Sequence, residues 1–215
     1  MGREAFLILI GTLAAIKGLY LLRSLPWVAP ILPTSTALLL IYIPVIHVTW
    51  RKIPITFFEK NISHGLSSIQ LFLRTSLILF PPFLVLAYFY QTLFSSLHLH
   101  IASLHEPFSL ILTQLFLVAF PEEFFFRGYL QTLVQRLFPK WIHFLGLEIG
   151  IAIPITACLF ALSHSIITVR WWHFAIFFPS LVFGWLRQKT NGLVAPILFH
   201  ALSNVVIIWI GSAYS

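Results

Sequence analysis

The sequence has few charged side chains, and negative charge is the scarcest. Its 215 residues include six acidic side chains, all of them Glu, against thirteen Lys and Arg. Charged residues make up 9% of the chain, hydrophobic residues make up 59%, and the mean hydropathy is +0.95. This composition excludes an ordinary soluble globular domain. It predicts a polytopic membrane protein.

Two further absences narrow the class. Cys158 is the single cysteine, which excludes an intramolecular disulfide. The sequence contains no internal repeat, which argues against a transporter built from two related halves. Most of the Lys and Arg residues lie between apolar runs. This placement indicates topology signals and not a nucleic-acid-binding surface. The expected partner of these basic residues is the lipid bilayer, and no pattern indicates an oligomeric state.

The apolar runs predict an all-α membrane bundle of about seven transmembrane helices, within a range of six to eight. Helices are expected because strands in lipid require a closed barrel, and the runs show no alternation. Each span needs roughly 20 apolar residues. The predicted spans cover residues 5–22, 27–48, 69–92, 107–137, 146–168, 172–187 and 192–211. Together they form a single integral membrane domain over residues 1–215.

The basic residues outside these spans are unevenly divided between the two sides. One side carries Arg23 and Arg170. The other side carries Arg3, Arg51, Lys52, Lys60, Arg136, Lys140, Arg187 and Lys189. The positive-inside bias therefore predicts a cytoplasmic N-terminus.

Two connections between spans are chemically distinctive. Residues 49–68 mix basic and aromatic side chains, and we expect them to lie along the membrane interface. The other connection carries His98, His100, His105 and Glu106. These side chains are of the types that bind zinc, but they lack a fixed ligand spacing. We predict no metal site there.

Adjacent glutamates stand in the middle of the predicted span 107–137. Carboxylates in hydrocarbon cost several kcal/mol unless they are paired or hydrated, so Glu122 and Glu123 are candidates for a functional site. Neighbouring helical residues point about 100° apart, so the two should have different roles. Arg127 follows Glu123 by four residues, on the same helix face. Glu123 is therefore the predicted structural carboxylate, and Glu122 is left free to bind and deprotonate water. The alternative is a purely structural ion network of all three.

Two later spans carry polar groups at helical spacing. The stretch FALSH places Phe160 and His164 four residues apart, and HALSN places His200 and Asn204 four apart. Each pair therefore shares a helix face. Single polar groups in membrane helices commonly form interhelical hydrogen bonds. Because three separate spans supply such groups, we expect one shared internal site.

These three stretches, PEEFFFRGYL, FALSH and NGLVAPILFHALSN, resemble the EExxxR, FxxxH and HxxxN motifs of the CPBP family. That family contains the CAAX proteases and bacteriocin-processing (ABI) membrane proteins. All motif positions are present in order, and the resemblance covers a predicted catalytic core of about residues 110–208.

The resemblance implies an intramembrane glutamate protease similar to type II CAAX prenyl endopeptidase, or a myxosortase-like member. By similarity, Glu122 and His164 activate the attacking water, and His200 and Asn204 stabilise the oxyanion. Glu123, Arg127 and Phe160 organise the site. No cofactor or metal is implied. The substrate would be a membrane-associated protein or peptide: a prenylated CAAX tail, a leader peptide or a C-terminal sorting tail. The expected location is a prokaryotic cytoplasmic membrane.

Two other functions are consistent with the sequence. A zinc-dependent membrane protease is disfavoured, because the chain lacks HExxH and the motif helices have no pair of histidines at ligand spacing. A nonproteolytic membrane scaffold or immunity partner is the alternative outside the enzymes, since family resemblance alone does not guarantee turnover.

Overall fold

The computed structural model describes residues 2–94, 106–144 and 147–213, and most of them are helical. This result confirms the prediction of an all-α membrane bundle. In chain order the elements are α1 (Gly2–Leu21), α2 (Leu32–Trp50), α3 (Ile62–Phe94), α4 (Pro107–Leu112), η1 (Thr113–Ala119), α5 (Phe120–Glu123), η2 (Phe124–Gln131), α6 (Thr132–Leu137), β1 (Trp141–Phe144), β2 (Leu147–Gly150), α7 (Ala152–Thr168), η3 (Trp171–Ile176), α8 (Phe177–Thr190) and α9 (Val194–Ala213).

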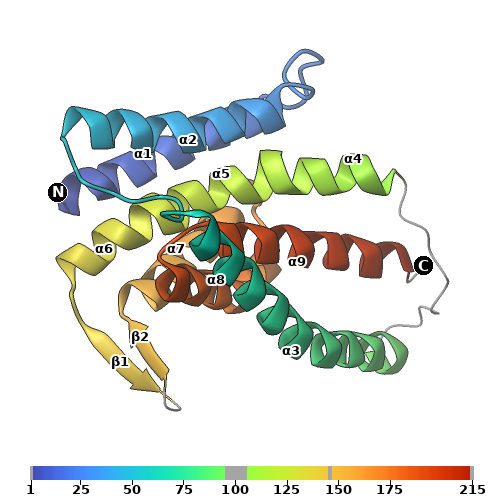
Figure 1. Ribbon diagram of the computed structural model, residues 1–215. Coiled ribbons are helices and arrows are strands. Elements are labelled where there is room, and N and C mark those ends of the chain that lie inside the picture. The colour runs from blue at the N-terminus through green and yellow to red at the C-terminus, as the bar shows by residue number, and fades with distance from the viewer. Residues whose placement is uncertain (1, 95–105, 145–146, 214–215) are drawn as a thin grey trace.

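A long rod, residues 107–137, runs through the middle of the fold. It is continuous from α4 to α6, although η1 and η2 within it are π-helical. Figure 1 shows the antiparallel pair α1 and α2 on one side of the rod, and α9 beside it on the other. Helix α3 crosses α9, and α7 packs against α8. The rod therefore contacts both the N-terminal and the C-terminal part of the bundle.

Five helices in the described residues are long and apolar enough to cross a membrane: α1, α2, α3, the rod and α9. The predicted span 107–137 has the bounds of the rod. The predicted span 146–168 is wrong at its start, because residues 147–150 form β2 and α7 begins only at Ala152. The predicted span 172–187 is also wrong at its start. It opens with the 3-10 turn η3, and α8 has 14 residues, fewer than a straight crossing needs.

The strands β1 and β2 form an antiparallel hairpin that the hydropathy pattern does not reveal. Trp141 pairs with Gly150, and His143 pairs with Glu148. Residues 141–144 fall in the predicted connection between the spans 107–137 and 146–168, whereas residues 147–150 were assigned to the second of these spans. The hairpin extends from the end of the bundle where α6 finishes (Figure 1).

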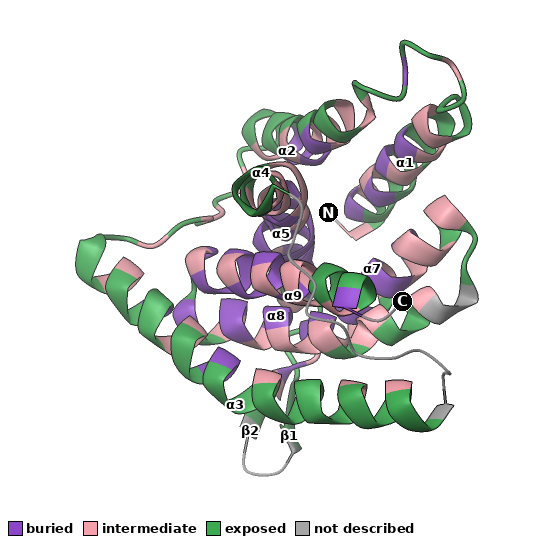
Figure 2. Ribbon diagram, turned by 90° about the vertical axis from the view of Figure 1, so that its right-hand side faces the viewer, coloured by how far each residue is buried: buried purple, intermediate pink, exposed green. Residues whose placement is uncertain are grey.

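Buried residues gather on the rod, α8 and α9, whereas α3 is mostly exposed (Figure 2). Phe125, Tyr129 and Leu133 on the rod have no exposed surface, while Leu77 on α3 is 75% exposed. An apolar exterior is expected where lipid replaces water as the solvent. The interior is consequently where the polar side chains of the rod find partners.

The connection between α2 and α3 packs onto the bundle. The ring of Phe57 stacks on Phe124, with centroids 4.2 Å apart, and Glu59 Oε1 accepts a hydrogen bond from the Val194 backbone N–H at 3.1 Å. Residues 49–50 belong to α2 and residues 62–68 to α3. The predicted interfacial segment 49–68 is thus shorter than expected and contacts the protein through one face.

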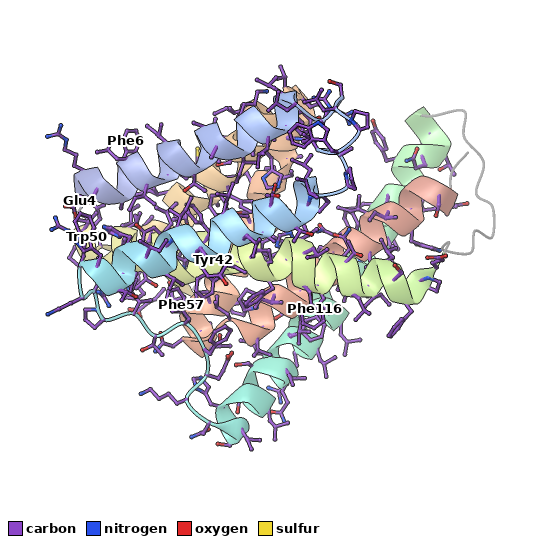
Figure 3. All side chains as sticks on the ribbon, turned by 90° about the horizontal axis from the view of Figure 1, so that it is seen from above. Glu4, Phe6, Tyr42, Trp50, Phe57 and Phe116 are labelled. Atoms are coloured by element: carbon purple, nitrogen blue, oxygen red, sulfur yellow. The ribbon has the colours of Figure 1, made fainter. Side chains whose placement is uncertain are left out.

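The two ends of the bundle differ in the chain segments they hold. The start of α1 and the ends of α2 and α6 lie at one end, and the C-terminus lies at the other (Figure 1). At the first end Glu4 lies near Trp50 (Figure 3), and Arg51 forms an ion pair with Glu4. The histidines of the 98–105 connection, predicted to bind no metal, lie outside the described residues.

Gly128 tests how tightly the connection packs on the rod. A Cβ at this position would lie 2.6 Å from Cδ1 of Phe57 and 3.2 Å from Cδ1 of Leu193. Gly128→Ala should therefore push Phe57 off its stack and lower the free energy of unfolding by about 1–3 kcal/mol. Gly11→Ala is the matched control, because nothing lies within 4 Å of that Cβ. Thermal unfolding in detergent measures both. An equal effect of the two substitutions would contradict the packing described.

Candidate active site

Glu122 and Glu123 lie in α5, between the two π-helical stretches of the rod. Such π turns occur frequently at functional sites, because they change the direction in which side chains leave a helix. The two carboxylates have different surroundings. The Glu123 side chain has no exposed surface, whereas that of Glu122 is 17% exposed.

Glu123 and Arg127 form a fully buried ion pair. Arg127 Nη1 donates to Glu123 Oε1 at 2.9 Å, and neither side chain has exposed surface. The other end of the guanidinium donates to Ser180 on α8, at 2.6 Å to Oγ and 3.3 Å to the backbone oxygen. A buried pair is tolerated only when further hydrogen bonds satisfy its remaining groups. Ser180 supplies part of this requirement from a different helix.

Glu123 also holds an imidazole of the third motif. The His200 Nδ1 atom lies 2.8 Å from Glu123 Oε1, and the His200 side chain is 5% exposed. A carboxylate accepts hydrogen bonds, so this contact puts a proton on Nδ1. The ring is thereby oriented with Nε2 toward Glu122. The sequence predicted Glu123 as a partner of Arg127, but no spacing rule revealed its contact with His200.

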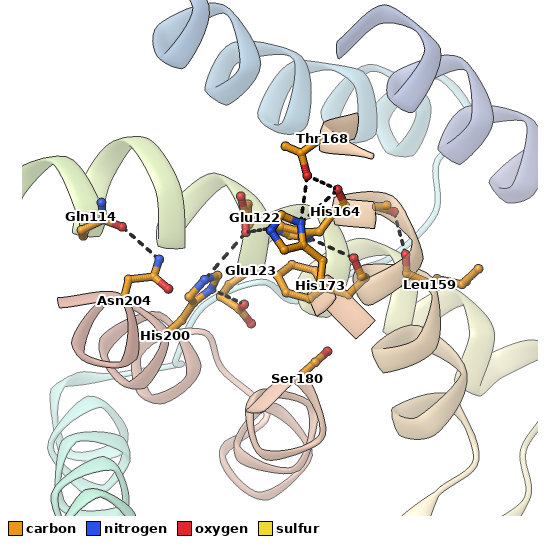
Figure 4. A network of polar contacts seen from close by, with 12 residues as sticks. Gln114, Glu122, Glu123, Leu159, His164, Thr168, His173, Ser180, His200 and Asn204 are labelled. Carbon is orange, nitrogen blue, oxygen red and sulfur yellow. Dashed lines mark hydrogen bonds and ion pairs between the residues drawn. The ribbon is translucent and has the colours of Figure 1, made fainter. Parts of the chain in front are cut away.

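Glu122 faces two histidines from two other helices. Its Oε2 atom lies 3.7 Å from His164 Nε2 and 3.7 Å from His200 Nε2 (Figure 4). This oxygen is buried, and it has no hydrogen bond partner within the described residues. Both separations exceed a direct hydrogen bond but are short enough for one water molecule to contact both atoms of a pair.

The ring of His164 is oriented by its own helix. Its Nδ1 atom lies 3.0 Å from the Phe160 backbone oxygen, so Nδ1 carries the proton and the neutral ring presents a lone pair at Nε2. His173, from η3, lies next to this ring, with centroids 6.4 Å apart. His173 Nδ1 contacts Thr168 Oγ1 at 2.9 Å. His173 belongs to none of the three motifs, so no pattern in the sequence predicted it.

Asn204 lies one turn beyond His200 on α9, but its closest polar partner is on the rod. Its Nδ2 donates to Gln114 Oε1 at 2.9 Å (Figure 4). No hydrogen bond joins Asn204 to Glu122, His164 or His200 in the part of the chain that the structure describes. Gln114 was missed by the sequence analysis, although it precedes Glu122 by eight residues and is the only amide side chain in that part of the rod before the glutamates.

Aromatic rings form the wall between these polar groups. Phe160, the first residue of the second motif, lies under the guanidinium of Arg127, 4.3 Å from Cζ to the ring centroid. It also contacts both His164 and His200 edge-on or tilted. Phe183 from α8 stacks on His200 at 4.6 Å and was not predicted. Rings over a guanidinium add cation–π attraction and exclude water from the ion pair.

No group of three or more His, Cys, Asp or Glu side chains in the described residues has an arrangement that could hold a metal ion. The three motifs nevertheless converge, because Glu122, His164 and His200 meet from α5, α7 and α9. An embedded carboxylate that faces two imidazoles has the groups that peptide hydrolysis requires.

Comparisons with known proteins agree with this chemistry. Residues 103–206, a little under half of the chain, match the family model described as type II CAAX prenyl endopeptidase Rce1-like. Neither the curated proteins nor the solved structures provide a match. The matched segment carries all three motifs and defines a membrane-embedded peptide hydrolase. Over this segment the chain is similar to the CAAX proteases of the CPBP family.

The ion pair can be tested by a double-mutant cycle. Arg127→Met leaves the buried carboxylate of Glu123 without its cation, and should lower the free energy of unfolding by about 3–5 kcal/mol. Adding Glu123→Gln removes the stranded charge, so the double variant should lose less stability than the sum of the two single variants. Chemical unfolding in detergent measures all four proteins. Strict additivity would show that the two groups do not interact.

Proposed function

We propose that this protein is an intramembrane glutamate protease that hydrolyses a peptide bond near the end of a membrane-associated protein or peptide. The observation that carries the proposal is the position of Glu122 Oε2. This atom is buried without a hydrogen bond partner in the described residues, and it lies 3.7 Å from Nε2 of both His164 and His200. An unsatisfied carboxylate oxygen is costly, so its place in the bundle favours a role with water or substrate.

In this proposal Glu122 and His164 activate the attacking water. The lone pair at His164 Nε2 and the carboxylate of Glu122 each accept one hydrogen of the water, which leaves its oxygen free to attack. The carboxylate takes the proton as the new C–O bond forms at the scissile carbonyl carbon. The same proton then passes to the leaving amine when the C–N bond breaks.

His200 and Asn204 are assigned to the developing oxyanion. His200 donates to the oxyanion from Nε2 in its doubly protonated form, and the contact of its Nδ1 with Glu123 holds the ring with Nε2 toward the site. Asn204 has two N–H donors, and Gln114 accepts one of them, which orients the amide and leaves the other for the substrate. Gln114 is thus assigned as a positioning residue.

Glu122, His200 and Asn204 lie on helices that are long and apolar enough to cross a membrane, which favours a substrate that reaches the site from the membrane. Its finer identity is open among a prenylated CAAX tail, a leader peptide and a C-terminal sorting tail. We further propose that the N-terminus is cytoplasmic. The bundle end that holds the start of α1 also holds the ends of α2 and α6, with Arg3, Arg51 and Arg136.

Replacing the proposed base gives the most direct test. Glu122→Gln keeps the shape of the side chain and should lower the cleavage rate about 10²- to 10⁴-fold, the usual contribution of a general base. Glu148→Gln is the control, since Glu148 lies on the exposed hairpin and pairs with His143. The measurement is mass spectrometry of C-terminal and leader fragments in cells that carry each variant. Equal fragment yields from parent and Glu122→Gln would remove the catalytic assignment and favour a scaffold.

Chelation distinguishes the glutamate mechanism from zinc hydrolysis. A water activated by Glu122 and His164 needs no metal, so the purified protein should retain its cleavage rate within about twofold after dialysis against a strong chelator. A zinc-bound nucleophile would be lost under the same treatment. Loss of activity that returns on adding zinc would overturn the glutamate assignment, and metal analysis of the active protein provides an independent check.

A further inference from the structure

A cavity lies at the end of the bundle that carries the hairpin, away from the three motifs. Its volume is about 430 Å³, within the range of roughly 300–1,000 Å³ usual for small-molecule sites. The walls come from α6, α8, β1 and the connection between α2 and α3. Polar side chains dominate the lining, and no carboxylate contributes to it. Those that carry the argument are Gln131, Arg136, Arg187 and Asn191.

Arg187 is a buried cation in this wall. Its side chain is 5% exposed and donates to the backbone oxygens of Thr56 at 2.6 Å and Phe57 at 3.2 Å. It forms no ion pair with a carboxylate of the described residues. The Glu59 carboxylate attracts this charge from beyond ion-pair distance. Buried charges in proteins are usually paired directly, so the charge of Arg187 is only partly compensated. The guanidinium has five donors, and further ones remain for a ligand.

Arg136 adds a second guanidinium to the same cavity. It is exposed, and its Nη2 donates to the backbone oxygen of Pro54. Like Arg187, it has no carboxylate partner among the described residues. Two guanidinium groups that share a cavity without acidic side chains attract an anion, and they match the oxygens of a phosphate especially well.

Gln131 indicates that the ligand is more than an anion. Its side chain is 6% exposed and its Nε2 donates to the Gly184 backbone oxygen at 3.0 Å. Its Oε1 atom is buried and has no hydrogen bond partner within the described residues. An unsatisfied amide oxygen requires a donor, which a phosphate diester alone does not supply. A hydroxyl or ammonium group carried by the same ligand would satisfy it.

We propose that this cavity binds the headgroup of a phospholipid, with its phosphate at Arg136 and Arg187 and its hydroxyl or ammonium group at Gln131. The setting favours a lipid over a free metabolite. Trp141 in the wall and Phe138 beside it are 51% and 52% exposed, and such aromatic rings are enriched at the level of the headgroups. Basic pockets between membrane helices recognise anionic lipids through the same groups.

Asn191 allows a negative charge to be introduced without the loss of a side-chain contact. It is exposed, lies in the left-handed region at φ 48°, and makes no side-chain hydrogen bond within the described residues. Aspartate tolerates this backbone conformation as well as asparagine does. Asn191→Asp therefore places a carboxylate in the cavity wall without removing a contact. Asn61→Asp is the matched control, because Asn61 uses only its Oδ1, which accepts from His64 N–H and Ser63 Oγ, and does not line the cavity.

The experiment titrates the detergent-purified full chain with phosphatidylglycerol, phosphatidylcholine and inorganic phosphate, and reads bound ligand by native mass spectrometry. Phosphatidylglycerol should bind more tightly than phosphatidylcholine, whose headgroup has no donor for Gln131. Asn191→Asp should weaken phosphatidylglycerol binding roughly tenfold, since like charges meet in the site. Arg136→Gln should weaken it in the same direction, and Asn61→Asp should leave it unchanged.

Three results would overturn the proposal. The first is equal phosphatidylglycerol affinity in the parent, Asn191→Asp and Asn61→Asp. The second is phosphatidylcholine binding as tight as phosphatidylglycerol binding. The third is inorganic phosphate binding that depends on Asn191 and Arg136 while the lipid does not bind, which would assign the cavity to a free phosphate. None of these readouts requires turnover, so the Glu122→Gln protein can be used in the same experiment. The lipid-binding proposal is therefore tested independently of the protease proposal.

Discussion

The cost of burying an unpaired charge inside a membrane bundle is the constraint on which this fold depends. Glu123 and Arg127 have no exposed surface, so each would be severely destabilising without the other. The pair in turn needs more donors and acceptors than one helix can supply. Ser180 from α8 and His200 from α9 provide them, and Phe160 from α7 covers the guanidinium. One buried pair thus fixes three helices against the rod.

This arrangement also explains why Glu122 can be left unsatisfied. The neighbouring carboxylate satisfies the arginine and orients His200, so Glu122 is not required for the electrostatic balance of the interior. Residues outside the family match support the same geometry. Glu59 accepts from the backbone N–H of Val194 at the start of α9, and Phe57 stacks beneath the rod on Phe124. The connection between α2 and α3 therefore positions the helix that carries His200.

Features that depend on local spacing could be predicted from the sequence, and those that depend on packing could not. The Glu123–Arg127 pair follows from a separation of four residues, and the bounds of the rod follow from one long apolar run. The contacts of His200 with Glu123 and of Asn204 with Gln114 span 77 and 90 residues, and no helical period reports such distances. The hairpin was missed because its strands have four residues each, too few to show a strand period, and the second strand adjoins the apolar run of α7.

The π-helical stretches on either side of the glutamates allow the number of residues per helical turn in the rod to change. A π turn carries more residues per turn than an α turn, so it holds one residue that an α-helix of the same length would lack. Deleting a residue from Thr113–Ala119 can be absorbed by rewinding that stretch, without the rotation of about 100° that the same deletion imposes on a regular helix. A chain that is one residue shorter in this stretch can therefore keep Glu122 and Glu123 pointing in the same direction around the helix axis.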